Sequence, residues 1–269
     1  MYSRPTAPLP IGGVVDEAIK LYRASFASCW PIALLGSLVS GAFGIFVTLY
    51  AGDAGVGSAD KTLEAALQSL QVYSQPPVVA LYVLQAVLSL AFYGALIAVQ
   101  NAISGGRKMG WRAGIAIGFT RLGRAVTAAV VWWAAVMLGL ILLLVPGFYL
   151  LGSLCLWPVA LYADDAGALE SLQVSRQLIK GHWWRTSTVL STVLVIILVV
   201  TIVIGIVAGV IVAMWRQDLA AAQLAVEGVG IFANVFVLPL IPASLLAAYY
   251  DLKLRRGAAH PAARTGTLP

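Results

Sequence analysis

The chain contains six long stretches whose interiors carry no charged side chain. A helix needs about 20 mostly apolar residues to cross the hydrocarbon core of a bilayer, and each stretch is close to or above that length. With 61% hydrophobic residues, against about 45–50% in soluble domains, the chain is not a water-soluble globule. We predict an all-α, polytopic membrane helical bundle with six transmembrane helices. The spans are Cys29–Tyr50, Val78–Ile103, Ala125–Val145, Gly147–Ala163, Thr186–Ala213 and Val229–Asp251.

The basic residues are distributed unequally between the two sides of the predicted membrane. Fifteen of the 17 lie in the N-terminal segment, the second and fourth loops and the C-terminal tail, and the other two are Lys61 and Arg216. Because loops retained in the cytoplasm carry the excess of Lys and Arg, both termini are expected there. Juxtamembrane cations of this kind favour anionic lipid as a partner. Nothing in the sequence indicates nucleic-acid binding.

Each pair of spans follows a segment with helical periodicity, so we predict three hairpins, each preceded by a cytoplasmic amphipathic surface helix. The first such helix lies in a segment of residues 1–28 that precedes the membrane domain of residues 29–256. Its apolar stripe runs from Ile11 to Phe26, with Glu17 and Lys20 on the opposite side. The others are expected around Trp111–Leu122 and Ala168–Lys180. We also expect an outer amphipathic helix over residues 60–74 and a flexible cytoplasmic tail over residues 257–269.

A cluster of cationic and aromatic residues directly precedes the fifth span. Two indoles and neighbouring cations are typical of the place where a chain enters the bilayer, because aromatic rings partition into the headgroup region. We predict that these residues are membrane-interface anchors. They are Lys180, His182, Trp183, Trp184 and Arg185.

Two features are relevant to transport. Pro158 interrupts the fourth span, and Pro239 with Pro242 interrupts the sixth, and paired interruptions can mark a central binding site. The polar side chains of Gln100, Asn101 and Asn234 could line a cavity, although such groups more often bond to neighbouring helices. Kinked packing without a ligand is the favoured explanation of these prolines.

The fifth span contains a pair of glycines four residues apart, Gly205 and Gly209. Small residues at this spacing let helices approach closely. The pair predicts helix packing, either within the bundle or between two copies of the chain.

The sequence predicts no catalytic residues, no metal site and no cofactor. The two histidines, His182 and His260, and the two cysteines, Cys29 and Cys155, are far apart in the chain. A metal site needs three or four convergent ligands, and a nucleophile needs an adjacent base. We therefore expect a protein that is not an enzyme.

Three segments resemble a group of prokaryotic six-helix membrane proteins. They are the run Leu144–Leu150, the run Ala160–Ser171 and the run Lys180–Arg185, and the segment Leu9–Phe26 is similar to the N-terminal helix of that group. The group includes YciC-like proteins and the membrane domain attached to some glycerophosphodiester phosphodiesterases. The resemblance implies a multi-pass protein of the prokaryotic plasma (inner) membrane. It transfers no hydrolase activity, because no soluble segment here is long enough for the phosphodiesterase domain.

Two functions follow as expectations. The first is a non-enzymatic protein that engages anionic lipid or a membrane partner through its cytoplasmic amphipathic helices, in envelope or lipid homeostasis. The alternative is a carrier or flippase for a lipid or small neutral solute, which requires a cavity open to one side. A protein partner or a homo-oligomer is compatible with either function.

Overall fold

A computed structural model describes residues 2–53, 71, 73–214 and 219–259, and its regular elements there are all helices, joined by short non-helical segments. The expected outer helix at residues 60–74 and most of the tail therefore lie largely outside the described part. Six helical segments are long and apolar enough to cross a membrane, in agreement with the number predicted. The helices are α1 (Ile11–Asp53), α3 (Pro76–Ser104), α4 (Trp111–Thr120), α5 (Leu122–Leu142), α6 (Leu144–Leu154), α7 (Trp157–Ala163), α8 (Ala168–Ile179), α9 (Trp183–Met214), α10 (Leu219–Val237) and α11 (Leu240–Ala259).

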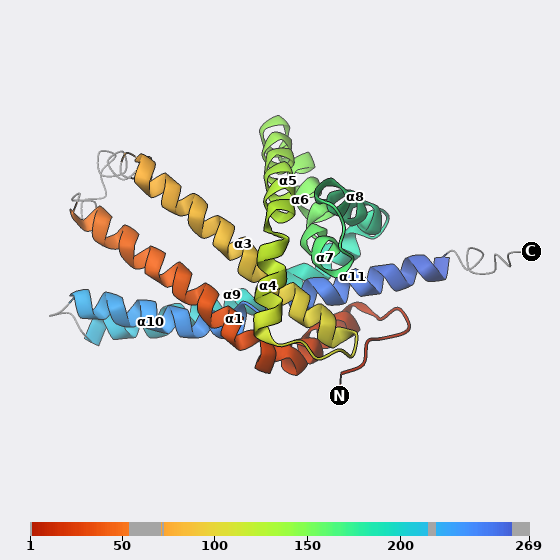
Figure 1. Cartoon of the computed structure of the whole chain (residues 1–269), viewed down its shortest axis with the longest axis horizontal. Helices are drawn as coiled ribbons and strands as arrows, with labels where there is room; N and C mark the ends of the chain where they lie inside the picture. Colours follow the sequence, from red (N-terminus) through yellow and green to blue (C-terminus); the bar gives the residue numbers. More distant parts are fainter. Residues whose placement is uncertain (1, 54–70, 72, 215–218, 260–269) are drawn as a thin grey trace, which may run out of the picture.

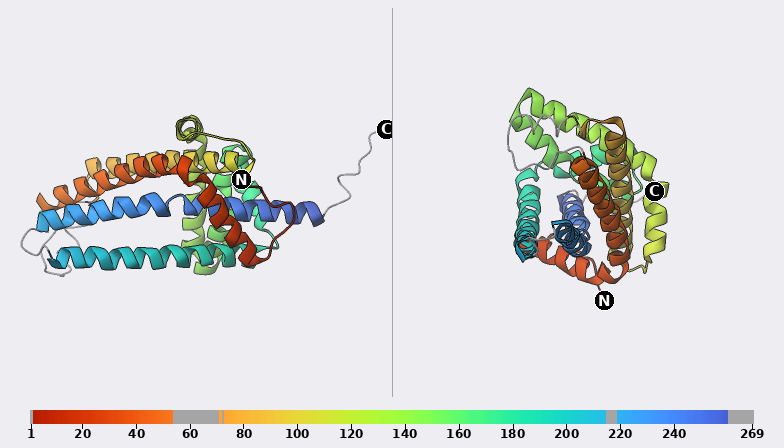
Figure 2. Two further views of the ribbon diagram at one scale, coloured as in Figure 1. Left: turned by 90° about the horizontal axis from the view of Figure 1, so that it is seen from below. Right: turned by 90° about the vertical axis from the view of Figure 1, so that its left-hand side faces the viewer.

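The first surface helix and the first span form one continuous helix. Helix α1 passes through Cys29, where the sequence had suggested a boundary, and contains Pro31. Proline removes one backbone donor and clashes with the preceding turn, so it bends a helix. Figure 2 shows that α1 is bent, with its N-terminal part inclined to the rest. The direction changes without a loop.

The buried face of α1 differs from the predicted stripe. Val14, Ala18 and Leu21 are almost fully buried, and Glu17 is only 7% exposed although the pattern placed it opposite the apolar residues. Ile11 is 37% exposed. The stripe is rotated because the N-terminal part of this helix packs against α9 and α11 and not against one flat surface.

Two of the six candidate spans are interrupted. The fourth breaks at Cys155–Leu156, between α6 and α7, and Pro158 lies in the first turn of α7. The sixth breaks at Leu238–Pro239, between α10 and α11. Proline is tolerated in the first turn of a helix, where no backbone donor is needed. Pro146 also lies in the first turn of its helix, because α6 begins at Leu144. The turn between the third and fourth spans is therefore at Leu143.

The helices that follow these breaks, α7 and α11, form the centre of the molecule. Helix α7 is buried from Trp157 to Tyr162, and α11 is buried over most of residues 243–252. Together with parts of α3, α5 and α8 they make the largest apolar cluster. Figure 1 shows that two pairs of helices, α1 with α3 and α9 with α10, extend from this centre toward the same side, whereas α5 with α6 extends in a different direction.

Helix α4 crosses α3 at very short range. A Cβ atom added to Gly118 would lie 2.3 Å from the backbone oxygen of Ala91, and one added to Gly114 would lie 2.4 Å from a methyl carbon of Val99. Only glycine allows this approach. The pair Gly114 and Gly118 has the four-residue spacing that the sequence analysis had considered only for Gly205 and Gly209.

Candidate functional site

Charged residues from distant parts of the chain meet around α11. Asp251 is 6% exposed, and its Oδ2 accepts hydrogen bonds from the Nε atoms of Arg185 at 3.2 Å and Arg255 at 2.9 Å. Arg185 lies at the start of α9, whereas Arg255 is one turn beyond Asp251 on α11. A carboxylate removed from water is stabilised when it is paired and hydrogen-bonded, as this one is.

Two further carboxylates complete this ionic network. Asp165 pairs with Arg121 at 3.2 Å and with Arg124 at 3.1 Å, and its φ of 58° places it in the left-handed region. Asp164 accepts a hydrogen bond from the Tyr249 hydroxyl at 2.6 Å and pairs with Lys253. These acids therefore join α7 to α5 and α11. They do not cap α8, whose N-cap is Gly167, and that helix has Glu170 in its first turn.

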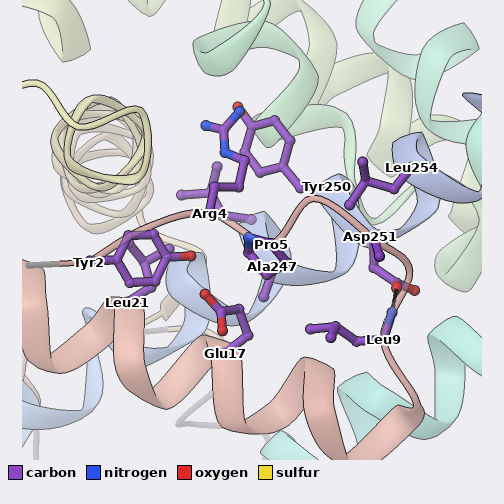
Figure 3. Close-up of a pocket in the computed structure, with 12 residues that line it drawn as sticks. Tyr2, Arg4, Pro5, Leu9, Glu17, Leu21, Ala247, Tyr250, Asp251 and Leu254 are labelled. Atoms are coloured by element: carbon purple, nitrogen blue, oxygen red, sulfur yellow. Dashed lines mark hydrogen bonds between the residues drawn. The ribbon is translucent and has the colours of Figure 1, made fainter.

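An N-terminal strap, residues 2–10, passes between α1 and α11 (Figure 3). The Arg4 guanidinium lies 3.4 Å from the centroid of the Tyr250 ring and donates to the Ser104 hydroxyl at 2.6 Å. At the other end of the strap, the Leu9 N–H donates to Asp251 Oδ1 at 2.8 Å. The strap is thus held at both ends by the ionic network and its aromatic neighbours.

Tyr2 is the first residue of the strap, and Glu17 of α1 lies beside it. Burial, followed by the hydrogen bond to Glu17, raises the pKa of the Tyr2 phenol above its usual range. The phenol is therefore a neutral donor at physiological pH. Glu17 Oε1 and Arg4 Nε are buried without a hydrogen-bond partner among the described residues. The space around these groups is small, about 20 Å³, so the strap nearly fills it.

The predicted interface anchors separate into two groups. Lys180 is exposed and Trp184 is 80% exposed, as expected of residues that face lipid. Trp183 instead stacks on Tyr149 with 6.0 Å between the ring centroids, and its indole N–H donates to the Tyr149 carbonyl at 3.3 Å. His182 is half-buried, while Arg185 belongs to the ionic network.

The three polar residues suggested as a cavity lining occupy different surroundings. Gln100 is fully buried, and its amide donates to the Pro239 carbonyl at 2.7 Å, at the break of the sixth span. Asn101 accepts from the Tyr250 hydroxyl at 2.6 Å and donates to the Ala163 carbonyl. Asn234 is exposed. Gln100 and Asn101 thus stabilise the ends of the broken spans.

Gly205 and Gly209 have no close neighbour within the described residues. A Cβ atom added to either would meet nothing within 4 Å. This pair therefore makes no close helix packing inside the chain, and both residues lie on an exposed face of α9. Packing against a second copy is the alternative that remains.

A cleft of about 340 Å³ lies between α1 and α3. Ile32, Leu96 and Phe92 give it an apolar surface, and Leu238, at the break of the sixth span, lines it as well. Ser40 and Ser89 are among the few polar residues on its wall. The cleft can hold a hydrocarbon chain, but it offers no charged group.

Within the described ranges there is no cluster of three or more His, Cys, Asp or Glu side chains able to bind a metal ion. Cys29 is fully buried and Cys155 partly buried, and both are free thiols. The charged side chains that converge do so as ion pairs. The arrangement holds helices together.

The fold defines an all-helical chain with six helical segments long and apolar enough to cross a membrane. Comparison with protein-family models, with curated proteins and with solved structures finds no match.

Sequence reasoning missed the role of Asp251 and Arg185. Asp251 had only marked the end of the sixth span, and Arg185 had been interpreted as an interface anchor. The four-residue spacing of Asp251 and Arg255 is a signal for an ion pair on one helix. The contribution of Arg185 has no such signal, because 66 residues separate it from Asp251.

Proposed function

We propose that this is a non-enzymatic, multi-pass protein of the prokaryotic plasma membrane. Its basic segments, which are the N-terminal segment, the second and fourth loops and the C-terminal tail, face the cytoplasm and engage anionic lipid. On this view the six spans form three hairpins, each following a cytoplasmic helix, and the role lies in envelope or lipid homeostasis. The 15 basic residues that the sequence assigns to one side support this orientation.

The observation that carries the proposal is the unequal pairing of the charges. Asp164, Asp165 and Asp251 are all engaged by cations. Six exposed cations have no carboxylate within 4 Å in the part of the chain that the structure describes. A cation near an anionic leaflet gains about 1 kcal/mol, so such a set can concentrate anionic lipid. These cations are Arg23, Arg107, Lys108, Arg112, Arg176 and Lys180.

The structure also suggests how the surface helices would contact lipid. Leu172, Ser175 and Leu178 of α8 are buried against the rest of the chain, and α4 uses its two glycines against α3. The buried faces of these helices are therefore not available to the bilayer. Lipid contact would come from the exposed cations and from Trp184.

Lipid selection can be measured by co-purification from nanodiscs that contain phosphatidylcholine and phosphatidylglycerol. Replacing Arg107, Lys108 and Arg112 by Gln should lower the phosphatidylglycerol retained by the protein, by up to about fivefold for each cation at 1 kcal/mol. A matched triple replacement of the neutral, exposed residues Gln173, Gln177 and Thr120 by Ala should not. Equal retention by both variants would contradict the proposal.

Orientation requires a separate test. Cysteines introduced at Lys108 and at Asp218 should be labelled by a membrane-impermeant reagent from opposite sides of the membrane, because the sequence places these loops on different sides. Labelling from the same side would disprove the six-span topology.

A carrier of a lipid or small neutral solute is the second candidate, and the cleft between α1 and α3 favours it. Substrate sites of many transporters lie beside interrupted helices, and Leu238 brings one interruption to this cleft. Gly36 lines the cleft, and Gly36→Leu should fill it, since an added Cβ would lie in ordinary contact with Phe92 at 3.5 Å. A carrier would lose lipid transfer between vesicles in this variant, whereas a protein that only binds headgroups would be unaffected.

A further inference from the structure

Two guanidinium groups converge on a single carbonyl oxygen of the N-terminal strap. Arg255 Nη2 donates to the Leu9 carbonyl at 2.6 Å, and Arg185 Nη2 donates to the same oxygen. Their Nε atoms both donate to Asp251 Oδ2. Asp251 therefore orients the two guanidiniums, and the Nη2 groups of both are directed at one acceptor.

The acceptor does not match the charge around it. Two guanidiniums and one carboxylate leave a net positive charge, whereas the Leu9 carbonyl is neutral. Guanidinium groups bind phosphate oxygens more strongly than neutral acceptors, because the hydrogen bonds are charge-assisted. The oxygen of an anion would thus bind here more strongly than the peptide that occupies the position.

The strap can leave without unfolding a helix. It precedes α1 and contains Pro5, Pro8 and Pro10, which limit backbone hydrogen bonding within it. Apart from the Leu9 peptide, it is held by the contacts of Arg4 with Tyr250 and Ser104, by the hydrogen bond of Tyr2 with Glu17 and by the apolar packing of the Leu9 and Tyr2 side chains. Figure 3 shows the strap running past α1, with Tyr250 and Asp251 of α11 on its other side.

We propose that Arg185 and Arg255 form a phosphate-binding site whose internal occupant is the Leu9 peptide. The Leu9 N–H also donates to Asp251 Oδ1 at 2.8 Å, so a replacing ligand needs a donor beside its phosphate. Phosphate groups with a neighbouring hydroxyl or ammonium group have that chemistry. A phospholipid headgroup and a free phosphate both qualify, and the lipid source rests on the function proposed above.

The position in the fold favours a headgroup as the source. Arg185 lies at the start of the fifth candidate span and Asp251 near the end of the sixth. Headgroups lie at this level when the two spans cross a bilayer. The site would therefore exchange the strap for a lipid without drawing the lipid into the apolar core.

Displacement of the strap can be followed by electron paramagnetic resonance of a spin label at Ser3→Cys, because Ser3 is exposed and lies next to Arg4. The labelled full chain is studied in nanodiscs of phosphatidylcholine, alone or mixed with phosphatidylethanolamine. These two lipids have the same net charge, but only phosphatidylethanolamine carries a donor beside its phosphate. We expect the mobile fraction of the label to rise about twofold or more with phosphatidylethanolamine, and further with phosphatidylglycerol. The chain that keeps Ser3 is labelled in the same way, and its signal measures the labelling of the native thiols of Cys29 and Cys155.

Three variants isolate the site. Arg255→Lys keeps the charge but removes the converging Nη2 group, and should abolish the response. Arg256→Gln removes a charge from the same helix and should leave the response unchanged. Arg4→Ala loosens the strap without touching the site, and should raise the mobile fraction even in phosphatidylcholine.

The outcomes separate this inference from the proposed function. Equal label mobility in all lipids together with no response to inorganic phosphate in detergent would overturn the site, even if the exposed cations still retain phosphatidylglycerol. Equal loss of response in Arg255→Lys and Arg256→Gln would overturn it as well. A response to inorganic phosphate in detergent but to no lipid would support the site with a soluble ligand, and would count against its lipid source.

Discussion

The centre of the molecule and helix α9 differ in what holds them. In the centre, α7, α8 and α11 are buried against one another, and the ionic network joins α11 to the end of α7 and to the start of α9. In α9, the most apolar window has no residue buried inside the molecule, although its mean hydropathy of 3.4 is the highest of the candidate spans. The hydrophobicity of α9 is therefore not used for burial inside the described part of the chain, which is the behaviour expected of a helix that would partition into a bilayer. Burial inside the protein depends instead on glycines, hydroxyls and charges, which the less apolar segments carry.

The largest effect should come from Asp251. Asp251→Ala leaves Arg185 and Arg255 without their shared carboxylate, and breaking a buried pair in this way costs about 3–5 kcal/mol. We expect a large fall in melting temperature in detergent. Asp16→Ala, which removes an exposed carboxylate from α1, should change it little. Equal melting of the two variants would show that the network does not stabilise the centre.

Two glycine pairs compare the regions directly. Gly118→Ala places a methyl group against the Ala91 carbonyl and should destabilise the chain by about 1–3 kcal/mol. Gly209→Ala meets no neighbour and should be neutral or slightly stabilising, because Ala favours helix. Thermal unfolding of both variants checks this difference. A loss at Gly209 that depends on protein concentration would instead reveal self-association.

Hydroxyl groups provide a third comparison. Ser175 of α8 accepts from the Leu156 N–H at 3.1 Å and donates to the Ser153 carbonyl at 3.1 Å, so it satisfies backbone groups at the break of the fourth span. Ser175→Ala should cost about 1–3 kcal/mol, because buried polar groups are left unpaired. Thr192→Ala in α9 removes only a bond to its own helix and should be silent. Urea or thermal unfolding of the pair measures the difference.

The smallest effects should come from the adjacent tryptophans. Trp183→Ala removes the contact with Tyr149 and should lower stability by about 1 kcal/mol. Trp184 is 80% exposed, so Trp184→Ala should leave stability in detergent unchanged and alter only the depth of the helix in a bilayer. Fluorescence quenching by lipids labelled at different depths, together with melting curves, tests both statements. A stability loss at Trp184 would contradict its assignment to the lipid-facing surface.

Several local features were predictable because they depend on neighbouring residues alone. The interruptions at Pro158 and Pro239 follow from the missing backbone donor of proline. The end of α8 follows from Gly181, whose φ of 85° suits glycine. The rotated buried face of α1 was not predictable, because Glu17 is buried by the strap and by α11, which are brought together by tertiary folding.

The sequence by itself determined the helical class and the number of candidate spans, because hydrophobicity and helix length are properties of consecutive residues. Only the tertiary structure decided which polar residues matter. Arg185 meets Asp251 across 66 residues, and Gln100 meets Pro239 across 139. Such contacts depend on how helices cross, and no pattern within one segment specifies a crossing. For the same reason Gly118 packs against α3 while Gly209, with identical local spacing, faces outward.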